Sequence, residues 1–310
     1  MAVYFSIILV AITVLTGIVW FADKFYLAQQ RKLKVVEAQT AAKAQGVIDL
    51  PAETIATLME PSPLVDTSVQ IFPVIAFVLI LRSFLYEPFQ IPSGSMMPTL
   101  LDGDFILVNK FNYGLKDPVA RNKFFDVGLP KRGDAVVFKY PRDPRIDYIK
   151  RVIGLPGERI IYRNKSLYIK EVCKESDAKC PDFVQVANSF TNKYQGPDAK
   201  GDMNQFEAVM LNKTHNILND QNTMPRTGHY FPQAGTAQDE FLVPAGHYFV
   251  MGDNRDNSLD GRFWGFVPEE NLVGQAVAIW MSFDFERTDD SFLPHWIPTN
   301  VRFERIGAIN

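Results

Sequence analysis

Two stretches near the start of the chain contain no charged side chains. Residues 1–22 carry none, and a helix of that length crosses a bilayer. Residues 67–81 are also uncharged, and the apolar stretch reaches residue 86 if the Arg82 side chain extends to the membrane interface. The pattern predicts transmembrane helices over residues 1–22 and 67–86. A cleaved signal peptide is the alternative for the first, and a buried core helix for the second.

Between these two stretches lies a polar segment, residues 23–66. Its basic residues are Lys24, Arg31, Lys32, Lys34 and Lys43, whereas no Lys or Arg precedes it. Positively charged loops tend to stay on the cytoplasmic side. We therefore expect a cytoplasmic loop at 23–66, with both chain ends and all of residues 87–310 on the other side of the membrane.

Short apolar runs separated by turn residues fill the rest of the chain. Strands are predicted at residues 105–108, 135–140, 148–153, 246–251 and 274–283. Residues 158–245 are more polar and rich in Asn, Gln, Asp, Lys and Thr. We expect a mostly β catalytic domain from residues 87–157 and 246–310, as a barrel or sandwich, with an inserted β subdomain at 158–245.

The composition of the chain limits which binding partners and cysteine chemistry are expected. The 310 residues have a formal net charge of -3 and no concentrated block of Lys or Arg, so nucleic acid is not an expected partner. Cys173 and Cys180 are the two cysteines, and in an extracytoplasmic domain they predict a local disulfide rather than free thiols. No metal site is expected there, because nothing nearby supplies further ligands.

Candidate chemistry begins in residues 88–101. Ser93 and Ser95 flank Gly94, with Pro92 and Pro98 on either side, and apolar residues surround the group. A rigidly held hydroxyl in apolar surroundings suits a nucleophile, provided that a base lies within reach. An ordinary Ser-Gly loop is the competing interpretation, and the local sequence does not choose between the two serines.

The base is either a histidine or a lysine. His247 precedes Asp253 closely and is a candidate for a Ser-His-Asp triad, while His215, His229 and His295 lie in less suggestive contexts. A lysine must be desolvated to act, since at its usual pKa roughly one in 2,500 is neutral at pH 7. In a strand, Lys150 shares a face with Tyr148 and Val152, which would supply apolar surroundings. An ordinary strand lysine reaching solvent is the alternative.

Four blocks, taken together, resemble bacterial type I signal peptidases, also called leader peptidases. In chain order they are Pro-Ser-Gly-Ser-Met-Met-Pro-Thr at 92–99, Arg-Gly-Asp at 132–134, Tyr-Ile-Lys-Arg-Val at 148–152 with Gly-Leu-Pro-Gly at 154–157, and Gly-Asp-Asn-Arg-Asp-Asn-Ser at 252–258. The resemblance runs from near Val69 to the C-terminus and weakens through residues 158–245. The two predicted helices with an inside loop also look like the form found in bacteria with two membranes.

The resemblance implies a Ser/Lys dyad, with Ser95 as nucleophile and Lys150 as general base. It implies that the Ser93 hydroxyl joins the Ser95 N–H in an oxyanion hole. Ser258 would orient the lysine, supported by an ion pair between Asp260 and Arg262. Gly261 departs from the pattern, because related proteins often carry serine there. Apolar residues would line the substrate pockets: Phe89, Ile91, Leu100, Ile106, Val137, Tyr148 and Ile149.

The implied function is a membrane-bound serine endopeptidase that removes signal peptides from secreted preproteins after small residues, of the Ala-x-Ala type, without metal or cofactor. Its partners would be preproteins and the phospholipid bilayer, at the inner (cytoplasmic) membrane with the catalytic domain in the periplasm. Trp264 and Trp280 could help docking to lipid or simply pack in the core. The rival hypotheses are a hydrolase that uses His247 and a membrane-tethered binding or chaperone module.

Overall fold

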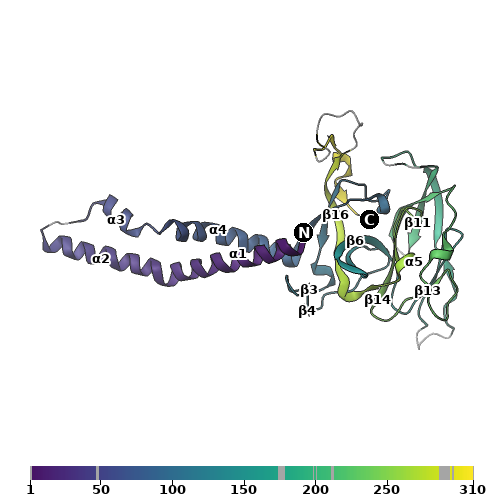
Figure 1. The fold of residues 1–310 in the computed structure, drawn as a ribbon, viewed down its shortest axis with the longest axis horizontal. Helices are drawn as coiled ribbons and strands as arrows, with labels where there is room; N and C mark the ends of the chain where they lie inside the picture. Colours follow the sequence, from purple (N-terminus) through teal and green to yellow (C-terminus); the bar gives the residue numbers. More distant parts are fainter. Residues whose placement is uncertain are drawn as a thin grey trace. The chain divides into compact units, whose positions relative to one another are not determined.

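The computed structural model describes residues 2–46, 49–173, 179–197, 199, 201–210, 213–285, 294 and 297–309. It divides into two units, Met1–Phe84 with Asp117–Arg121, and Leu85–Lys116 with Asn122–Asn310. Figure 1 shows the helices of the first unit in purple and blue and the strands of the second in blue through teal and green to yellow.

The first unit begins with one long helical path. α1 (Ala2–Ala22) passes through a π-helical turn, η1 (Asp23–Leu27), directly into α2 (Ala28–Ala44), and α3 (Ala52–Met59) follows. The described part of the segment expected to connect the two membrane helices on the cytoplasmic side is thus largely helical. The reason is local: α2 is rich in Ala, Gln and Lys, which have high helix propensity.

The second apolar stretch forms α4 (Pro63–Ile80), which a π-helical turn, η2 (Leu81–Leu85), extends. Gly17 allows α1 and α4 to approach closely, since a Cβ there would lie 2.8 Å from the Phe72 ring. The helical segments Phe5–Ala44 and Pro63–Leu85 are each long and apolar enough to cross a membrane. The expected pair of apolar helices is therefore present.

The second unit is mostly β, as expected. Its main sheet has the strand order β1-β2-β16-β5-β6-β14-β15, with β17 and β18 added on β16. The strands are β1 (Tyr86–Gln90), β2 (Asp104–Asn109), β5 (Ala135–Tyr140), β6 (Asp143–Gly154), β14 (His247–Met251), β15 (Val267–Pro268), β16 (Leu272–Asp284), β17 (Asn300–Val301) and β18 (Gly307–Ala308). Each strand predicted from the apolar runs coincides with or overlaps one of these.

Residues of the polar segment form two further sheets. One has the order β13-β7-β8-β9 and the other β10-β11-β12. Their strands are β7 (Arg159–Arg163), β8 (Ser166–Lys170), β9 (Val184–Gln185), β10 (Ala187–Lys193), β11 (Met203–Met210), β12 (Lys213–Asp220) and β13 (Glu240–Leu242). A small hairpin of β3 (Leu115–Lys116) and β4 (Lys123–Phe125) and a short helix, α5 (Gly261–Trp264), complete the unit.

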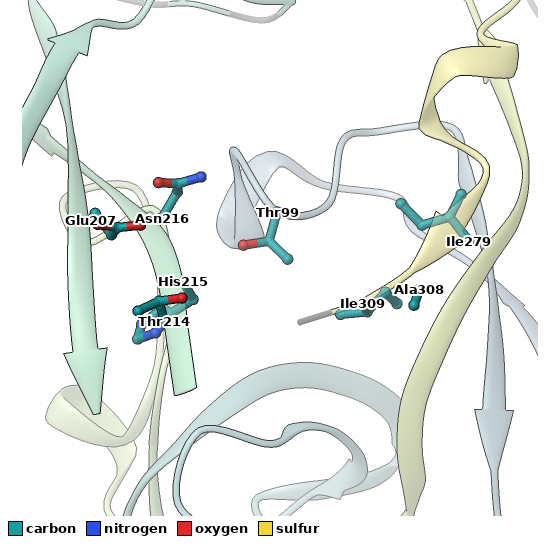
Figure 2. Close-up of a pocket in the computed structure, with 8 residues that line it drawn as sticks. All are labelled: Thr99, Glu207, Thr214, His215, Asn216, Ile279, Ala308 and Ile309. Carbon is teal, nitrogen blue, oxygen red and sulfur yellow. The ribbon is translucent and has the colours of Figure 1, made fainter. Parts of the chain in front are cut away.

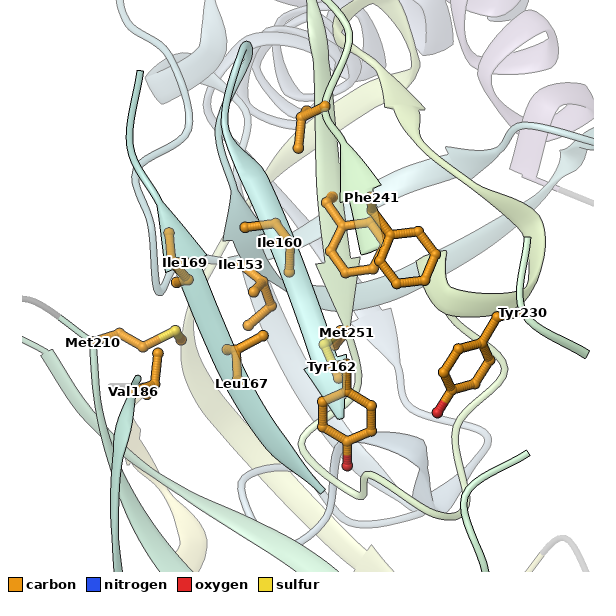
Figure 3. Close-up of a cluster of buried hydrophobic side chains, with 12 residues drawn as sticks. Ile153, Ile160, Tyr162, Leu167, Ile169, Val186, Met210, Tyr230, Phe241 and Met251 are labelled. Atoms are coloured by element: carbon orange, nitrogen blue, oxygen red, sulfur yellow. The ribbon is translucent and has the colours of Figure 1, made fainter. Parts of the chain in front are cut away.

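The polar segment and the main sheet share one apolar core, shown in Figure 3. Ile160 of β7 and Leu167 of β8 pack there with Ile153 of β6. The rings of Phe241 and Phe249 stack with their centroids 4.6 Å apart, and both are fully buried. This shared core fixes the two sheets of the polar segment against the strands that carry the site described below.

The Phe241–Phe249 stack gives a direct test of this packing. We expect Phe241→Ala to lower the free energy of unfolding by about 3–5 kcal/mol, because it removes a buried ring and leaves a cavity. Chemical denaturation of the purified protein in detergent measures the change. Phe190→Ala is the control, since that ring is 58% exposed. Equal effects of the two substitutions would contradict the shared core.

Candidate active site

A short turn presents Ser95. Gly94–Met96 form one turn of 3-10 helix, and the Leu100 N–H donates to the Met96 carbonyl at 3.0 Å. Met96, Met97 and Leu100 are buried almost completely beneath the turn. Because these apolar side chains anchor it from below, the turn holds the Ser95 hydroxyl at its partly exposed side.

Lys150 reaches the same hydroxyl from β6. Its Nζ lies 2.8 Å from Ser95 Oγ and donates to the Ile149 carbonyl at 2.7 Å. The residue is 4% exposed, and its amine lies 5.4 Å from the centre of the Tyr148 ring. Burial lowers the pKa of Lys150 to about 8, although Asp260 and Asp253 act in the opposite direction.

Two buried ion pairs surround the lysine. Arg151 binds Asp253 through two hydrogen bonds of 2.8 and 2.7 Å, and Arg262 binds Asp260 through two of 2.8 Å. Burial by itself would raise the pKa of each carboxyl, but the arginine partners hold both pKa values below the ordinary one. Both aspartates are therefore charged, and each has its own counterion.

Gly252 separates Ser95 from Ser258. A Cβ on Gly252 would lie 2.5 Å from the Ser95 carbonyl oxygen and 2.3 Å from Ser258 Oγ. The Gly252 N–H donates to Asp260 at 2.9 Å, which ties this strand end to the buried ion pair. Only a residue without a side chain fits between the two serines.

Asn254 holds the serine turn from behind. Its side-chain Nδ2 donates to the Gly94 carbonyl at 3.0 Å, and its backbone N–H donates to the Ser95 carbonyl at 3.2 Å. Thr99 joins the same network, because its hydroxyl donates to Asp253 at 2.6 Å. The sequence block at 252–258 includes Asn254, but the sequence analysis gave this residue no role. The polar character of that block was the available signal.

The residues expected to line substrate pockets gather in one region. Phe89, Ile91, Leu100, Ile106, Val137 and Ile149 belong to a single apolar cluster, which we call the pocket cluster. Tyr148 packs instead with a neighbouring cluster and stacks on Tyr140 at 4.6 Å. The arrangement as a whole places a hydroxyl, a buried amine of lowered pKa and apolar side chains together, which suits nucleophilic acyl transfer.

Comparison with known proteins decides the family. Residues 64–281 match the family described as signal peptidase, peptidase S26. The chain belongs to this family. The resemblance noted from the four sequence blocks is thereby confirmed, and the chain is a peptidase.

Two curated relatives from this family align with nearly the whole length of the chain. Signal peptidase I of Buchnera aphidicola from Acyrthosiphon pisum is 39% identical and covers 100% of both chains. Signal peptidase I of Haemophilus influenzae is 37% identical, over 97% of this chain and 90% of its own. Among solved structures, a signal peptidase I from Enterococcus faecalis is 27% identical, covers 48% of this chain and 98% of its own, and has a TM-score of 0.26.

The described contacts of Ser95 are with Lys150 and not with His247. His247 Nδ1 lies 2.9 Å from the Ala245 carbonyl oxygen, and Lys150 is the basic group in contact with the Ser95 hydroxyl. Burial lowers the pKa of His215 to about 3, so this imidazole is neutral. His295 lies outside the described residues.

Ser93 and Ser258, the two serines expected to assist the dyad, differ in their contacts. Ser93 Oγ lies 3.5 Å from Ser95 Oγ, at the mouth of the site. Ser258 is 4% exposed and adjoins Gly252, but its hydroxyl makes no hydrogen bond with any described residue. The orienting role of Ser258 stays a prediction. The Asp260–Arg262 pair is formed despite Gly261, which begins α5.

The remaining expectations concern the two cysteines, a possible metal site and two tryptophans. Cys173 and Cys180 form a disulfide. Across the described part of the chain, no cluster of three His, Cys, Asp or Glu side chains could hold a metal. Trp264 is 5% exposed and packs against Phe138, so it is a core residue, whereas Trp280 is 46% exposed beside Phe105.

The close fit at Gly252 predicts a large effect from one methyl group. We expect Gly252→Ala to reduce kcat by about 100-fold or more, because the new Cβ displaces the Ser95 turn from Lys150. Cleavage assays with circular dichroism measure activity and folding together. Gly228→Ala is the matched control, since nothing lies within 4 Å of a Cβ there. Full activity of Gly252→Ala would contradict the placement of Ser95 against Gly252.

Proposed function

We propose that this peptidase removes signal peptides from exported proteins with a Ser/Lys dyad of Ser95 and Lys150, cleaving after small residues of the Ala-x-Ala type. The observation that carries the proposal is the 2.8 Å contact between Ser95 Oγ and the buried amine of Lys150. A nucleophile within hydrogen-bond distance of a base of suitable pKa is the requirement for serine catalysis.

The lowered pKa makes the lysine usable as a base. With a pKa of about 8, roughly one Lys150 side chain in ten is neutral at pH 7, against roughly one in 2,500 for an ordinary lysine. Lys150 then takes the proton of Ser95, and Oγ attacks the carbonyl carbon of the scissile peptide. The Ser95 N–H and the Ser93 hydroxyl are the proposed donors to the oxyanion, worth about 3–4 kcal/mol each.

The intermediate then collapses in two stages. The Lys150 ammonium returns its proton to the leaving nitrogen, the C–N bond breaks, and the signal peptide stays attached to Ser95 as an ester. Lys150, neutral again, deprotonates a water molecule that attacks this ester. The C–Oγ bond breaks, the proton returns to Ser95, and the signal peptide leaves with a free carboxylate. No cofactor enters this scheme.

The pocket cluster supports the preference for small residues. Ile91, Leu100 and Ile106 are nearly fully buried, and Phe89 and Ile149 pack at its edge. Apolar walls of this kind suit short side chains such as alanine at the positions before the scissile bond. Ser258 supports the dyad in this proposal through its position beside Gly252.

The dyad is tested by two substitutions and a pH profile. We expect Ser95→Ala and Lys150→Met to reduce cleavage of a preprotein to background while the protein stays folded. Because the active lysine is the deprotonated one, kcat/KM should rise about tenfold per pH unit below a pKa of about 8 and level off above it. The measurement is cleavage of a purified preprotein, with sequencing of the new N-terminus.

The rival hypotheses predict other outcomes. A triad based on His247 requires His247→Ala to abolish turnover, and a binding or chaperone module requires Ser95→Ala to leave function intact. A flat pH profile between pH 6 and 9 would count against a neutral Lys150.

We also propose that the two apolar helices anchor the enzyme in the inner (cytoplasmic) membrane, with the loop of residues 23–66 in the cytoplasm and the β unit in the periplasm. The basic residues of that loop support this orientation. Single cysteines placed at Lys34 and at exposed Met224, in a variant lacking Cys173 and Cys180, test it in intact cells. A membrane-impermeant thiol reagent should label position 224 alone, and labelling of position 34 would reverse the topology.

A further inference from the structure

A cavity of about 480 Å³ opens beside Ser258, with a volume in the usual range of ligand-binding pockets. Ser258 is one of the residues expected to support the dyad, and Gly252 alone separates it from the Ser95 carbonyl. The described residues that line the cavity are Arg226, His229, Asn257, Ser258, Leu259 and Phe263. The cavity therefore adjoins the candidate active site.

A chain of contacts also joins Leu259 of the lining to Lys150. The Trp264 indole N–H donates to the Leu259 carbonyl at 3.2 Å, and the Trp264 ring packs edge-on against Tyr140, with centroids 5.7 Å apart. Tyr140 stacks on Tyr148, whose ring centre lies 5.4 Å from the Lys150 amine. The cavity is thus connected to both members of the candidate dyad.

In the order of the main sheet, this cavity and the pocket cluster fall on opposite sides of β6, which carries Lys150. β1, β2, β16 and β5 lie on one side and supply most of the pocket cluster, whereas β14 lies on the other and leads into residues 252–264. No described lining residue of the cavity belongs to the pocket cluster. An extended peptide advances about 3.3 Å per residue, so its two halves run in opposite directions from the scissile bond. A substrate whose signal-peptide side covers the pocket cluster therefore directs its following residues toward the cavity.

Arg226 gives the cavity a positive charge. Its guanidinium lies 5.5 Å from the centre of the Phe263 ring and donates to the Asp256 backbone carbonyl at 3.2 Å. The Asp256 carboxylate is bound by Lys165 instead, at 2.8 Å. Among the described residues, Arg226 forms no ion pair, and the described lining contains no Asp or Glu. A guanidinium held in place with N–H donors to spare suits a carboxylate.

We propose that this cavity is the subsite for the residues that follow the scissile bond, and that Arg226 selects an acidic side chain among them. The proposal rests on the proposed function and adds a substrate preference to it. A preprotein with Asp or Glu near the new N-terminus of its mature part is cleaved faster than one with the corresponding amide. Leu259 and Phe263 supply apolar surface for the stem of that side chain.

The experiment measures kcat/KM of the full-length enzyme in uncharged detergent. The peptides share one signal-peptide side and carry a single Glu, Gln or Lys at each of the first four positions after the scissile bond. We expect Glu to exceed Gln about fivefold at one or two neighbouring positions, the upper range for a partly exposed ion pair. In Arg226→Gln this ratio should fall close to one, and Arg226→Glu should favour Lys over Glu at the same positions.

Arg163→Gln is the matched control. It removes the same charge from another exposed arginine, which Asp239 already pairs and which does not line the cavity. This variant should keep the wild-type ratio between Glu and Gln peptides. Circular dichroism of all variants shows whether each remains folded.

Glu207→Gln is a second control, for the overall charge of the β unit. Figure 2 shows Glu207 at a separate cavity of about 300 Å³, and the described lining of that cavity includes none of Ser95, Lys150 and Ser258. The substitution changes the net charge by the same amount as Arg226→Gln, with the opposite sign. It should leave the ratio unchanged, because the preference depends on one cavity and not on the charge of the whole unit.

Several outcomes would overturn the subsite. They are equal rates for Glu and Gln peptides in wild type, a preference that survives in Arg226→Gln, an equal preference at all four positions, and an altered ratio in Glu207→Gln. If Ser95→Ala cleaves any of these peptides, the proposed function itself fails, whatever their charge.

Discussion

The removal of one amine from water is the constraint on which the site depends. Lys150 is buried beside Ser95, and burial is the largest contribution to its lowered pKa. Two buried carboxylates stand close enough to oppose this effect. Each is matched by its own arginine, Arg151 for Asp253 and Arg262 for Asp260. Each arginine thus offsets the charge of its aspartate, which limits how far that carboxylate can raise the pKa of Lys150.

The polar segment takes part in this arrangement. Leu218 of β12 is bonded to the strand-like stretch 253–255, whose Asn254 in turn holds the carbonyls of Gly94 and Ser95. Leu218 also packs with Met97 and Leu101, which lie under the serine turn. A segment that looked accessory in sequence is therefore one of the supports of the candidate nucleophile.

Sequence patterns were sufficient to predict features that depend only on neighbouring residues in the chain. Apolar runs located the main strands, and strand alternation placed Lys150 with Tyr148 and Val152. The choice of Ser95 over Ser93 needed the family resemblance, since the turn is nearly symmetric. The roles of Asn254 and Thr99 were missed, because their contacts join residues more than 150 positions apart and depend on sheet order. The sequence analysis placed Ala28–Ala44 only on one side of the membrane and gave it no secondary structure, although its composition has high helix propensity.

The unbroken helical path of the first unit has a consequence for the lipid boundary. Its segment Phe5–Ala44 contains 40 residues, which at 1.5 Å each extend for about 60 Å. The hydrocarbon layer of a bilayer is about 30 Å thick. In the proposed topology, a span that begins with the apolar residues of α1 leaves α2 outside the acyl chains, where it continues as helix in water.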